Sequence, residues 1–450
     1  VRVAATLVEH LHEAGVPDDV VQLVVCEDGP VGQHLVTHDG VDTVVLTGSL
    51  ATADLFRSWK PDIRLFAETS GKNALVITPH ADLDLAVADL VRSAFGHAGQ
   101  KCSAASLAIL VGDVYDSPRF RRQLIDAVES IDVGPSVRSE ATMGPIIGEP
   151  TDRLQRGLTA LDDGERWVVE PRRLDFDGWL WSPGVRDGVK VDSWYHRTEC
   201  FGPVLGLIHA ADLDEAIDIQ NSGEFGLTGG IHSLDPSEVE RWIEQVEVGN
   251  AYVNRHITGA IVQRQPFGGW KGSSVGPGAK AGGPNYVMQL GSWTSSSGSH
   301  DDYDEQWAGH FSVEHDPTDL FCEANIFRYR PLERIIIRHG EHASDLDLSR
   351  VRRAASLCGV RVLDSDARTE DEEAVCRRLA RLDIERIRVV GTSVGAELRA
   401  EANRRGVHIA DAPVTASGRL ELQHYMREQA VSRTLHRFGN LVGLSPSVRP

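Results

Sequence analysis

The sequence predicts an α/β protein built around parallel strands, and two observations lead to this prediction. Short apolar runs alternate with stretches whose apolar residues recur at helical spacing, first up to about residue 66 and again beyond residue 330. Strands that alternate with helices favour a parallel sheet with helices on its faces. In both regions a strand enters a Gly, Ser and Thr turn that opens a helix, VLTGSLATADL at 45–55 and VVGTSVGAEL at 389–398. The likeness of these two turns indicates a weak internal repeat.

Composition excludes several classes of protein. Hydrophobic residues make up 41% of the 450 residues and charged residues 25%, which is typical of globular domains and not of disordered or fibrous chains. The formal net charge of −20 argues against nonspecific binding to nucleic acids or anionic membranes. No apolar run approaches the ~20 residues of a membrane span. The six cysteines form no CxxC pair, and no metal-ligand spacing appears, so we expect free thiols, no metal and a cytoplasmic location.

The first elements follow from apolar spacing. Leu7, Leu11 and Val16 share one face of a predicted amphipathic helix. A run of apolar residues at 20–25 predicts a buried strand, and the run at 41–46 predicts a second one before the Thr47-Gly48-Ser49 turn. The helix after this turn is expected to end before Pro61.

The strongest helical signal lies over 83–95, with Asp82 and Asp84 at its start and Gly96 and Gly99 after its end. The segment Gln100-Lys101-Cys102-Ser103 is therefore expected in a turn, before a strand at 107–111. Ser117 followed by Pro118 predicts the start of a further helix. Glycines cluster at 259–291, which predicts a long functional loop.

A serine-rich linker near 295–302 precedes the second α/β pattern. This pattern predicts strands at 334–338, 360–363 and 387–390, with helices near 346–358, after Thr369 and up to about residue 405. Thr369 and Glu372 have the spacing of a capping box. The order predicts a second parallel sheet.

Two residues have the properties that covalent catalysis requires. Cys102 lies in a predicted turn beside Lys101, where a thiolate can be favoured, and Glu68 on another loop could activate water. Taken alone, each has an ordinary structural interpretation, because a single cysteine is usually a small buried hydrophobe. His97 fits a helix end better than a partner of Cys102. The LTGS and ECFGP segments could supply backbone N–H groups and a ribose acceptor for a dinucleotide.

Seven ordered motifs resemble the aldehyde dehydrogenase superfamily over residues 1–295. They are LTGS at 46–49, AETSGKN at 67–73, GHAGQKCSAAS at 96–106, TECFGPV at 198–204, FGLTGG at 225–230, YVNR at 252–255 and PFGGWKGS at 266–273. The stretches at 91–120 and 254–287 resemble most closely the L-glutamate γ-semialdehyde (Δ1-pyrroline-5-carboxylate) dehydrogenase module of bifunctional proline utilization A. The end of the chain, REQAVSRTLHRFGNL, is similar to the aldehyde-dehydrogenase-like C-terminal domain of longer members.

The resemblance implies a fold and a division of the chain. Residues 1–67 would form the C-terminal part of a Rossmann-like NAD-binding domain and 68–265 an α/β catalytic domain. Residues 266–300 would hold the substrate-anchor loop and a linker. Residues 301–450 would form a second Rossmann-like domain, non-catalytic, that covers the active site or mediates assembly, and a homo-oligomer is expected.

The resemblance also implies the chemistry. Cys102 would attack the aldehyde carbon, with its backbone N–H holding the oxyanion, and hydride would pass to NAD. Glu68 would activate water to release L-glutamate, in the second step of proline catabolism. The binding roles fall to Gly48 and Ser49 for cofactor phosphates, Glu199 for the nicotinamide ribose, Phe201 for packing on the cofactor, Ser103, Gly282 and Gly283 for the substrate α-carboxylate, and Phe267 for the aldehyde pocket. Asn254 would order the loops, and Cys200 would take no part.

The chain departs from the family at its start. The family's oxyanion-hole Asn, its adenosine-ribose Lys and its first cofactor-domain strands lie upstream of the position of Val1, so we expect a fragment that is inactive or poorly folded alone. Ala53 stands where many relatives have glycine. FAD would be expected only if a proline dehydrogenase domain preceded this chain. An aldehyde dehydrogenase of other specificity, an inactive assembly module and the choice of NAD or NADP stay open.

Overall fold

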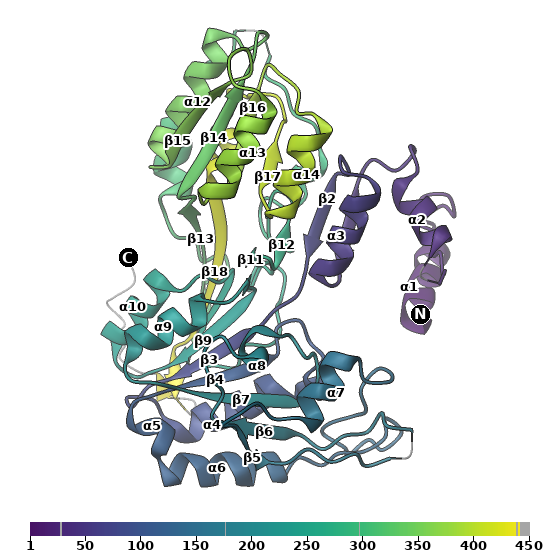
Figure 1. The fold of residues 1–450 in the computed structure, drawn as a ribbon, viewed down its shortest axis with the longest axis vertical. Coiled ribbons are helices and arrows are strands. Elements are labelled where there is room, and N and C mark those ends of the chain that lie inside the picture. The colour runs from purple at the N-terminus through teal and green to yellow at the C-terminus, as the bar shows by residue number, and fades with distance from the viewer. Residues whose placement is uncertain (28, 176, 297, 438–439, 442–450) are drawn as a thin grey trace.

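The computed structural model describes all residues except 28, 176, 297, 438–439 and 442–450. Its centre is a nine-stranded sheet, and the prediction of an α/β protein is confirmed (Figure 1). In spatial order its strands are β13 (Glu323–Pro331), β18 (Met426–Thr434), β10 (Asn250–Val253), β9 (Thr228–His232), β3 (Asn73–Ile77), β4 (Ala105–Val111), β7 (Val204–Ala210), β6 (Gly184–Asp187) and β5 (Arg166–Val169). The seven inner strands run parallel, while β13 and β5 pair antiparallel at the two edges.

Helices pack on this sheet through apolar stripes. In α4 (Leu83–Phe95) the N-cap Asp82 accepts from the Asp84 and Leu85 N–H groups, and the Leu90 side chain is among those fully buried. The predicted Ser117 cap is also present, at the start of α6. The other helices of this region are α5 (Asp113–Asp116), α6 (Pro118–Glu129), α7 (Asp152–Thr159), α8 (Trp194–Arg197), α9 (Leu213–Asn221) and α10 (Pro236–Gln245).

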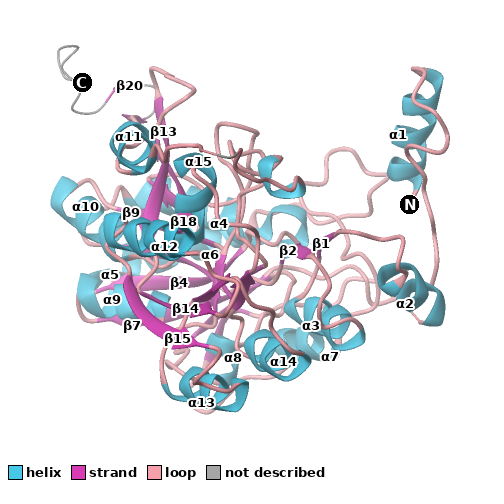
Figure 2. Ribbon diagram, turned by 90° about the horizontal axis from the view of Figure 1, so that it is seen from above, coloured by secondary structure: helices cyan, strands magenta, loops and turns pink. Residues whose placement is uncertain are grey.

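A small sheet carries the N-terminal part of the chain. Its strands are β1 (Val44–Thr47), β2 (Leu65–Glu68) and β12 (Ser274–Val275), with α3 (Leu50–Trp59) packed against it. The helices α1 (Arg2–Glu13) and α2 (Pro30–Thr37) stand apart from both larger sheets (Figures 1 and 2). The predicted strand at 20–25 is wrong. Among the described residues that segment forms no strand pairing, and Val24 and Val25 are 58% and 63% exposed; β1 pairs with β2.

The second parallel sheet is present as predicted after residue 330. Its strand order is β15 (Arg361–Asp366), β14 (Arg334–His339), β16 (Arg386–Val390) and β17 (His408–Ala410), and its helices are α12 (Asp345–Leu357), α13 (Glu372–Arg381) and α14 (Ala396–Arg404). The predicted capping box is wrong. Asp371 is the N-cap of α13 and accepts from the Ala374 N–H, whereas Thr369 belongs to the turn that follows β15.

Two long strands connect the two halves. β13 and β18 belong to the C-terminal part of the sequence, yet β18 pairs with β10 of the central sheet (Figure 1). The remaining short elements are β8 (Phe225–Gly226), β11 (Trp270–Lys271), β19 (His436–Arg437), β20 (Asn440–Leu441), α11 (Tyr303–Gln306), α15 (Gly418–Glu421), η1 (Gly96–Gly99), η2 (Met288–Leu290), η3 (Trp307–Phe311) and η4 (Leu422–Tyr425). Among the residues described, no helix has the length and apolar character to cross a membrane.

Candidate active site

Cys102 lies in the predicted turn, between η1 and β4. The turn is fastened to the central sheet by the buried Asn73 side chain, which donates to the carbonyl oxygens of Cys102 at 2.7 Å and Ala104 at 3.0 Å. The Asn73 amide oxygen in turn accepts from the Thr228 N–H at 3.0 Å. Asn73 therefore fixes the backbone that carries the thiol. It is part of the AETSGKN motif, but sequence reasoning gave it no role.

The surroundings of Cys102 disfavour its thiolate form. Burial raises its pKa, the Ser103 N–H opposes this effect, and the nearby charges of Glu199 and Glu68 raise the pKa further. The two carboxylates that the sequence singled out are thus close enough to Cys102 to act on its charge. A cation bound beside the thiol would favour the thiolate.

Glu68 ends β2, between β1 and β12. Its carboxylate accepts from the Gly269 N–H at 2.9 Å. Burial raises its pKa to about 8, against the lowering effects of Lys280 and the Gly269 N–H, while Glu428 adds to the rise. A carboxyl group with this pKa exchanges protons near neutral pH, which is the property a general base requires.

The Glu199 side chain binds the loop that follows Glu68. The Gly71 N–H, three residues after Glu68, donates to Glu199 Oε1 at 2.9 Å. A Cβ on Gly71 would lie 2.8 Å from the Cys102 carbonyl oxygen, so only glycine allows this approach. Burial raises the pKa of Glu199, against the Gly71 N–H, the Ser70 hydroxyl and the Lys72 charge. The loop between β2 and β3 therefore brings together three predicted site residues, Glu68, Cys102 and Glu199.

The predicted phosphate site lies at the start of α3. Ser49 caps this ten-residue helix by accepting from the Thr52 N–H at 3.1 Å. Gly48 donates its N–H to the Glu68 carbonyl oxygen at 3.2 Å, and both Gly48 and Ser49 are exposed. An exposed helix N-terminus beside the strand that bears Glu68 fits the phosphates of a dinucleotide. The Phe201 ring is 38% exposed on the ECFGP turn, whose carbonyl at Phe201 accepts from Gln100 at 3.2 Å.

Three of the predicted substrate residues, Phe267, Gly282 and Gly283, lie close together in the glycine-rich loop. Phe267 and Ala281 exchange two backbone hydrogen bonds of 2.9 and 2.8 Å, which place Phe267 beside Gly282. Gly282 has a φ of +74°, and the Gly283 N–H donates to the Lys280 carbonyl oxygen at 3.0 Å within a turn. Ser103 is buried behind Cys102, where its carbonyl oxygen accepts from Thr228.

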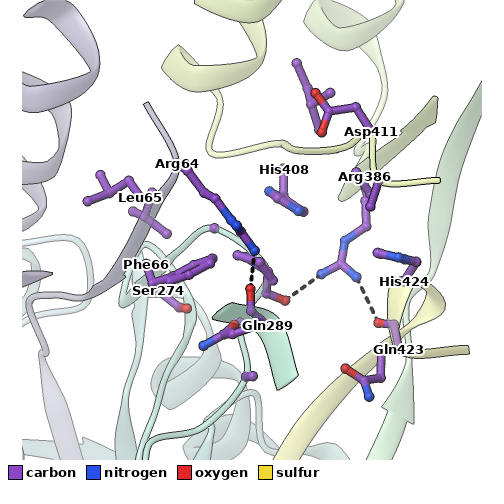
Figure 3. A pocket seen from close by; sticks show the side chains of 18 of the residues that line it. Arg64, Leu65, Phe66, Ser274, Gln289, Arg386, His408, Asp411, Gln423 and His424 are labelled. Carbon is purple, nitrogen blue, oxygen red and sulfur yellow. Dashed lines mark hydrogen bonds between the residues drawn. The ribbon is translucent and has the colours of Figure 1, made fainter. Parts of the chain in front are cut away.

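Two cavities adjoin these loops. A small one of about 50 Å³ is lined by residues that include Thr47, Glu68 and Ala281. A larger one of about 470 Å³ opens between the small sheet and the C-terminal sheet (Figure 3). Two of its lining arginines bind backbone, since Arg64 donates to the Gly291 carbonyl oxygen at 3.1 Å and Arg386 to that of Gln423 at 3.0 Å, while Arg57 and Arg399 pair with the carboxylates of Asp54 and Asp411.

Asn254, Cys200 and His97 lie outside this cluster of polar contacts. The Asn254 side chain bonds both the N–H and the carbonyl of Ser233, at 3.0 and 2.8 Å, which fits the loop-ordering role predicted for it. Cys200 is buried in the core beside Gly157. His97 adopts a left-handed φ of 56° in η1, so it is a kink residue and not an ordinary helix end.

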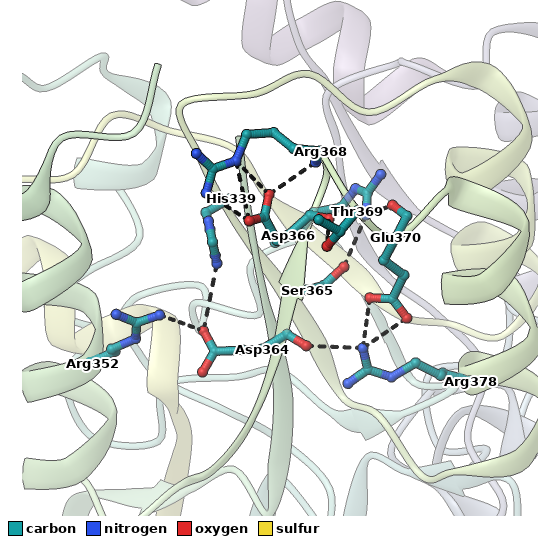
Figure 4. A network of polar contacts seen from close by, with 10 residues as sticks. His339, Arg352, Asp364, Ser365, Asp366, Arg368, Thr369, Glu370 and Arg378 are labelled. Carbon is teal, nitrogen blue, oxygen red and sulfur yellow. Dashed lines mark hydrogen bonds and ion pairs between the residues drawn. The ribbon is translucent and has the colours of Figure 1, made fainter. Parts of the chain in front are cut away.

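In the C-terminal sheet, polar groups in the turns that follow the strands are bound by other side chains of the chain. The Gly395 N–H, at the start of α14, donates to Glu372 Oε1 at 2.7 Å. At the end of β15, Asp366 is bound by Arg368, with a shortest distance of 2.7 Å, and the surrounding charges are paired in the same manner (Figure 4). The start of α14 and the Asp366 carboxylate therefore both carry internal partners. In the described ranges no group of three His, Cys, Asp or Glu side chains is placed to hold a metal.

Comparison with known proteins gives consistent matches. The model of the aldehyde dehydrogenase family matches residues 1–294. A 1-pyrroline-5-carboxylate dehydrogenase of Bacillus mycoides (strain KBAB4) is 36% identical over 296 residues, which cover 63% of this chain and 56% of that protein. The chain thus spans about half the length of the curated relatives it matches.

One solved structure extends the likeness to the C-terminal part. Proline utilization A (PutA) from Corynebacterium freiburgense is 48% identical with a TM-score of 0.90, and the match covers 98% of this chain and 46% of that one. A Thermus 1-pyrroline-5-carboxylate dehydrogenase with bound NAD is 33% identical with a TM-score of 0.59, covering 64% of this chain and 56% of that one.

Proposed function

We propose that this chain, which belongs to the aldehyde dehydrogenase family, oxidises L-glutamate γ-semialdehyde, the open form of Δ1-pyrroline-5-carboxylate, to L-glutamate with NAD. One observation carries the proposal: the loop between β2 and β3 brings a half-buried thiol, Cys102, together with two carboxylates of raised pKa, Glu68 and Glu199. The relatives named 1-pyrroline-5-carboxylate dehydrogenase and the PutA structure support the choice of substrate. We also propose a cytoplasmic homo-oligomer.

The residues of the chain divide the reaction between them. The Cys102 thiol gives up its proton to solvent water, and its Sγ bonds to the aldehyde carbon as the C=O π electrons move to oxygen. The Cys102 N–H stabilises the negative oxygen that forms. Bound NAD would accept hydride, with Gly48 and Ser49 on its phosphates, Phe201 against it and Glu199 on its ribose. Glu68 then takes a proton from water, whose oxygen attacks the thioester carbon and expels the Cys102 thiolate.

The substrate's α-carboxylate would be held by the Ser103 hydroxyl and by the backbone at Gly282 and Gly283. Phe267, fixed beside them through Ala281, would line the aldehyde pocket. Glycine suits an anion site because the missing side chain lets N–H groups approach closely.

The test is NADH formation by the native full-length protein. We expect turnover of Δ1-pyrroline-5-carboxylate, and much weaker turnover of a neutral aldehyde of the same chain length. Ser103→Ala should raise KM for the first substrate and leave KM for the second unchanged. Equal turnover of both aldehydes by the wild type would disprove the carboxylate anchor, and turnover of neither would disprove the function.

The pH dependence has a defined sign. Because Glu68 acts as a base only when ionised, and its pKa is about 8, thioester hydrolysis should slow about tenfold per pH unit well below 8 and level off above it. Measuring single-turnover hydrolysis after the NADH burst at several pH values gives this acid limb of the pH–rate profile directly. A limb centred near pH 4.5, the ordinary value for Glu, would show that burial does not control the base.

A further inference from the structure

Lys280 is a buried cation in the loop that follows the PFGGWKGS motif. Its side chain is 1% exposed, and its ammonium group donates to Asn250 Oδ1 at 3.1 Å and to the Gly268 carbonyl oxygen. Burying an ammonium group is costly unless charged partners compensate. Neither of these partners carries a charge, so the compensation has to come from carboxylates nearby.

Glu68 is the first such carboxylate. The Gly268-Gly269 backbone separates it from Lys280, with the Gly269 N–H bound to Glu68 and the Gly268 carbonyl bound to Lys280. A Cβ on Gly268 would lie 2.8 Å from Glu68 Oε1 and 3.2 Å from Lys280 Cγ. One glycine therefore touches both side chains, and any larger residue would force them apart.

Glu428 is the second carboxylate, and it comes from β18. Its Oε2 accepts from the Lys280 backbone N–H at 2.7 Å, and its Oε1 accepts from Asn285 Nδ2, also at 2.7 Å. The Tyr329 hydroxyl accepts from the same Asn285 amide group at 2.7 Å. Because β18 and the Tyr329 strand both belong to the C-terminal part of the chain, this carboxylate links that part to the loop of Lys280.

We propose that Lys280 is a positioning residue for the base Glu68, and that Glu428 competes with Glu68 for the single positive charge of Lys280. The C-terminal part of the chain thereby sets how readily the base ionises. This inference rests on the proposed function, because it concerns Glu68 as the base of thioester hydrolysis.

The electrostatic effects agree with this arrangement in sign. Burial lowers the pKa of Lys280 to about 8, and the charges of Glu68 and Glu428 oppose that change. For Glu68, Lys280 lowers the pKa and Glu428 raises it. Burial also raises the pKa of Glu428, against Asn285, the Lys280 N–H, the Lys280 charge and Arg419. Tyr286 faces the same site, and its pKa is raised first by burial and then by Glu68.

Two substitutions should shift the pKa of the base Glu68 in opposite directions. Lys280→Met removes the cation that favours ionised Glu68, so the acid limb of single-turnover hydrolysis should move to higher pH by about one unit or more. Glu428→Gln removes the competing anion, so Lys280 compensates Glu68 alone and the limb should move to lower pH. Loss of packing alone would not move the limb in opposite directions.

Glu385→Gln is the matched control. It also neutralises a carboxylate of the C-terminal part, in the ion pair with Arg427, the neighbour of Glu428. It should leave the limb where the wild type has it.

The outcomes separate the two proposals. No turnover of Δ1-pyrroline-5-carboxylate by the wild type would disprove the function. Wild-type turnover with unshifted limbs in the variants, or with both limbs shifted in one direction, would overturn the role of Lys280 and Glu428. If Lys280→Met fails to fold, Glu428→Gln decides, because a limb at or above the wild-type pH contradicts the competition.

Discussion

The small sheet that carries Glu68 and the C-terminal sheet use the same local device, a parallel strand that enters a tight turn and a helix, yet the active-site carboxylates and the Arg388–Glu421 pair of the C-terminal sheet are compensated to different degrees. At the active site, burial outweighs the partners of Glu68 and Glu199, and the pKa of each carboxyl is raised. In the C-terminal sheet, Arg388 and Glu421 are both fully buried and meet through two hydrogen bonds of 2.9 Å. This pair is complete, whereas Arg386 on the same strand donates to two backbone carbonyl oxygens, and burial lowers its pKa to about 10.

The difference shows where chemistry can occur. A charge with a complete set of partners is fixed in one protonation state and contributes to structure. A carboxyl that is buried with too few partners can exchange a proton near neutral pH. The buried Arg388–Glu421 pair is the first case, and Asp366 shows the same pairing at a more accessible position, where the Arg368 guanidinium holds the pKa of its carboxyl well below the usual range. Glu68, at an equivalent strand end, illustrates the second.

The largest effect expected from this comparison is at the thiol. Cys102→Ala should lower kcat by about 10⁴-fold or more, because no other group can form the covalent intermediate. Cys200→Ala is the matched control, since that thiol points into the core beside Gly157 even though it lies between Glu199 and Phe201 in the chain, and it should keep its activity. NADH formation measures both. Residual activity in Cys102→Ala comparable to that of the control would place the nucleophile elsewhere.

Glu68→Gln should produce the next largest effect. Hydride transfer precedes hydrolysis, so the variant should release a burst of one NADH per active site and then turn over about 10²–10⁴-fold more slowly. Glu199→Gln should instead raise KM for NAD and show no burst. Absence of the burst in Glu68→Gln would mean that Glu68 acts before hydride transfer.

Arg388→Met tests the buried ion pair of the C-terminal sheet. It leaves Glu421 buried without its charged partner and should lower the free energy of unfolding by about 3–5 kcal/mol, with kcat of the folded protein unchanged. Urea unfolding measures the loss. The double substitution Arg388→Met with Glu421→Leu should recover most of it. A lowered kcat in the folded single variant would show that the C-terminal pairs serve catalysis.

Much of the site could be predicted from the sequence because its residues lie at the ends of locally encoded elements. Asp82 and Ser117 cap helices where expected, and the turn of Cys102 follows directly from the end of α4. The AETSGKN motif marks the loop that gathers the carboxylates. Helical periodicity and capping depend on neighbours in the chain, so they are visible in one sequence.

The pairing of distant segments could not be predicted in this way. Nothing in the local pattern at 426–434 shows that β18 pairs with β10, which lies about 180 residues earlier. The contact of Lys280 with Glu428 depends on that pairing, so sequence reasoning missed both residues. The wrong strand at 20–25 has the same cause, because apolar alternation does not reveal whether a partner strand exists.

The misplaced capping box provides the smallest test. Glu372 lies in the first turn of α13 but bonds the Gly395 N–H, and α14 has no side-chain cap of its own. Glu372→Gln should therefore cost about 1 kcal/mol of stability through α14. Glu373→Gln removes the same first-turn charge from α13 and an exposed pair with Arg377, worth about 0.3–0.5 kcal/mol. Urea unfolding compares the two variants, and amide exchange over 395–404 should quicken only in Glu372→Gln. Equal losses of unfolding free energy in the two variants, with amide exchange over 395–404 unchanged, would mean that Glu372 stabilises only α13. The turn before α14 would then be as open as the turn at Ser49.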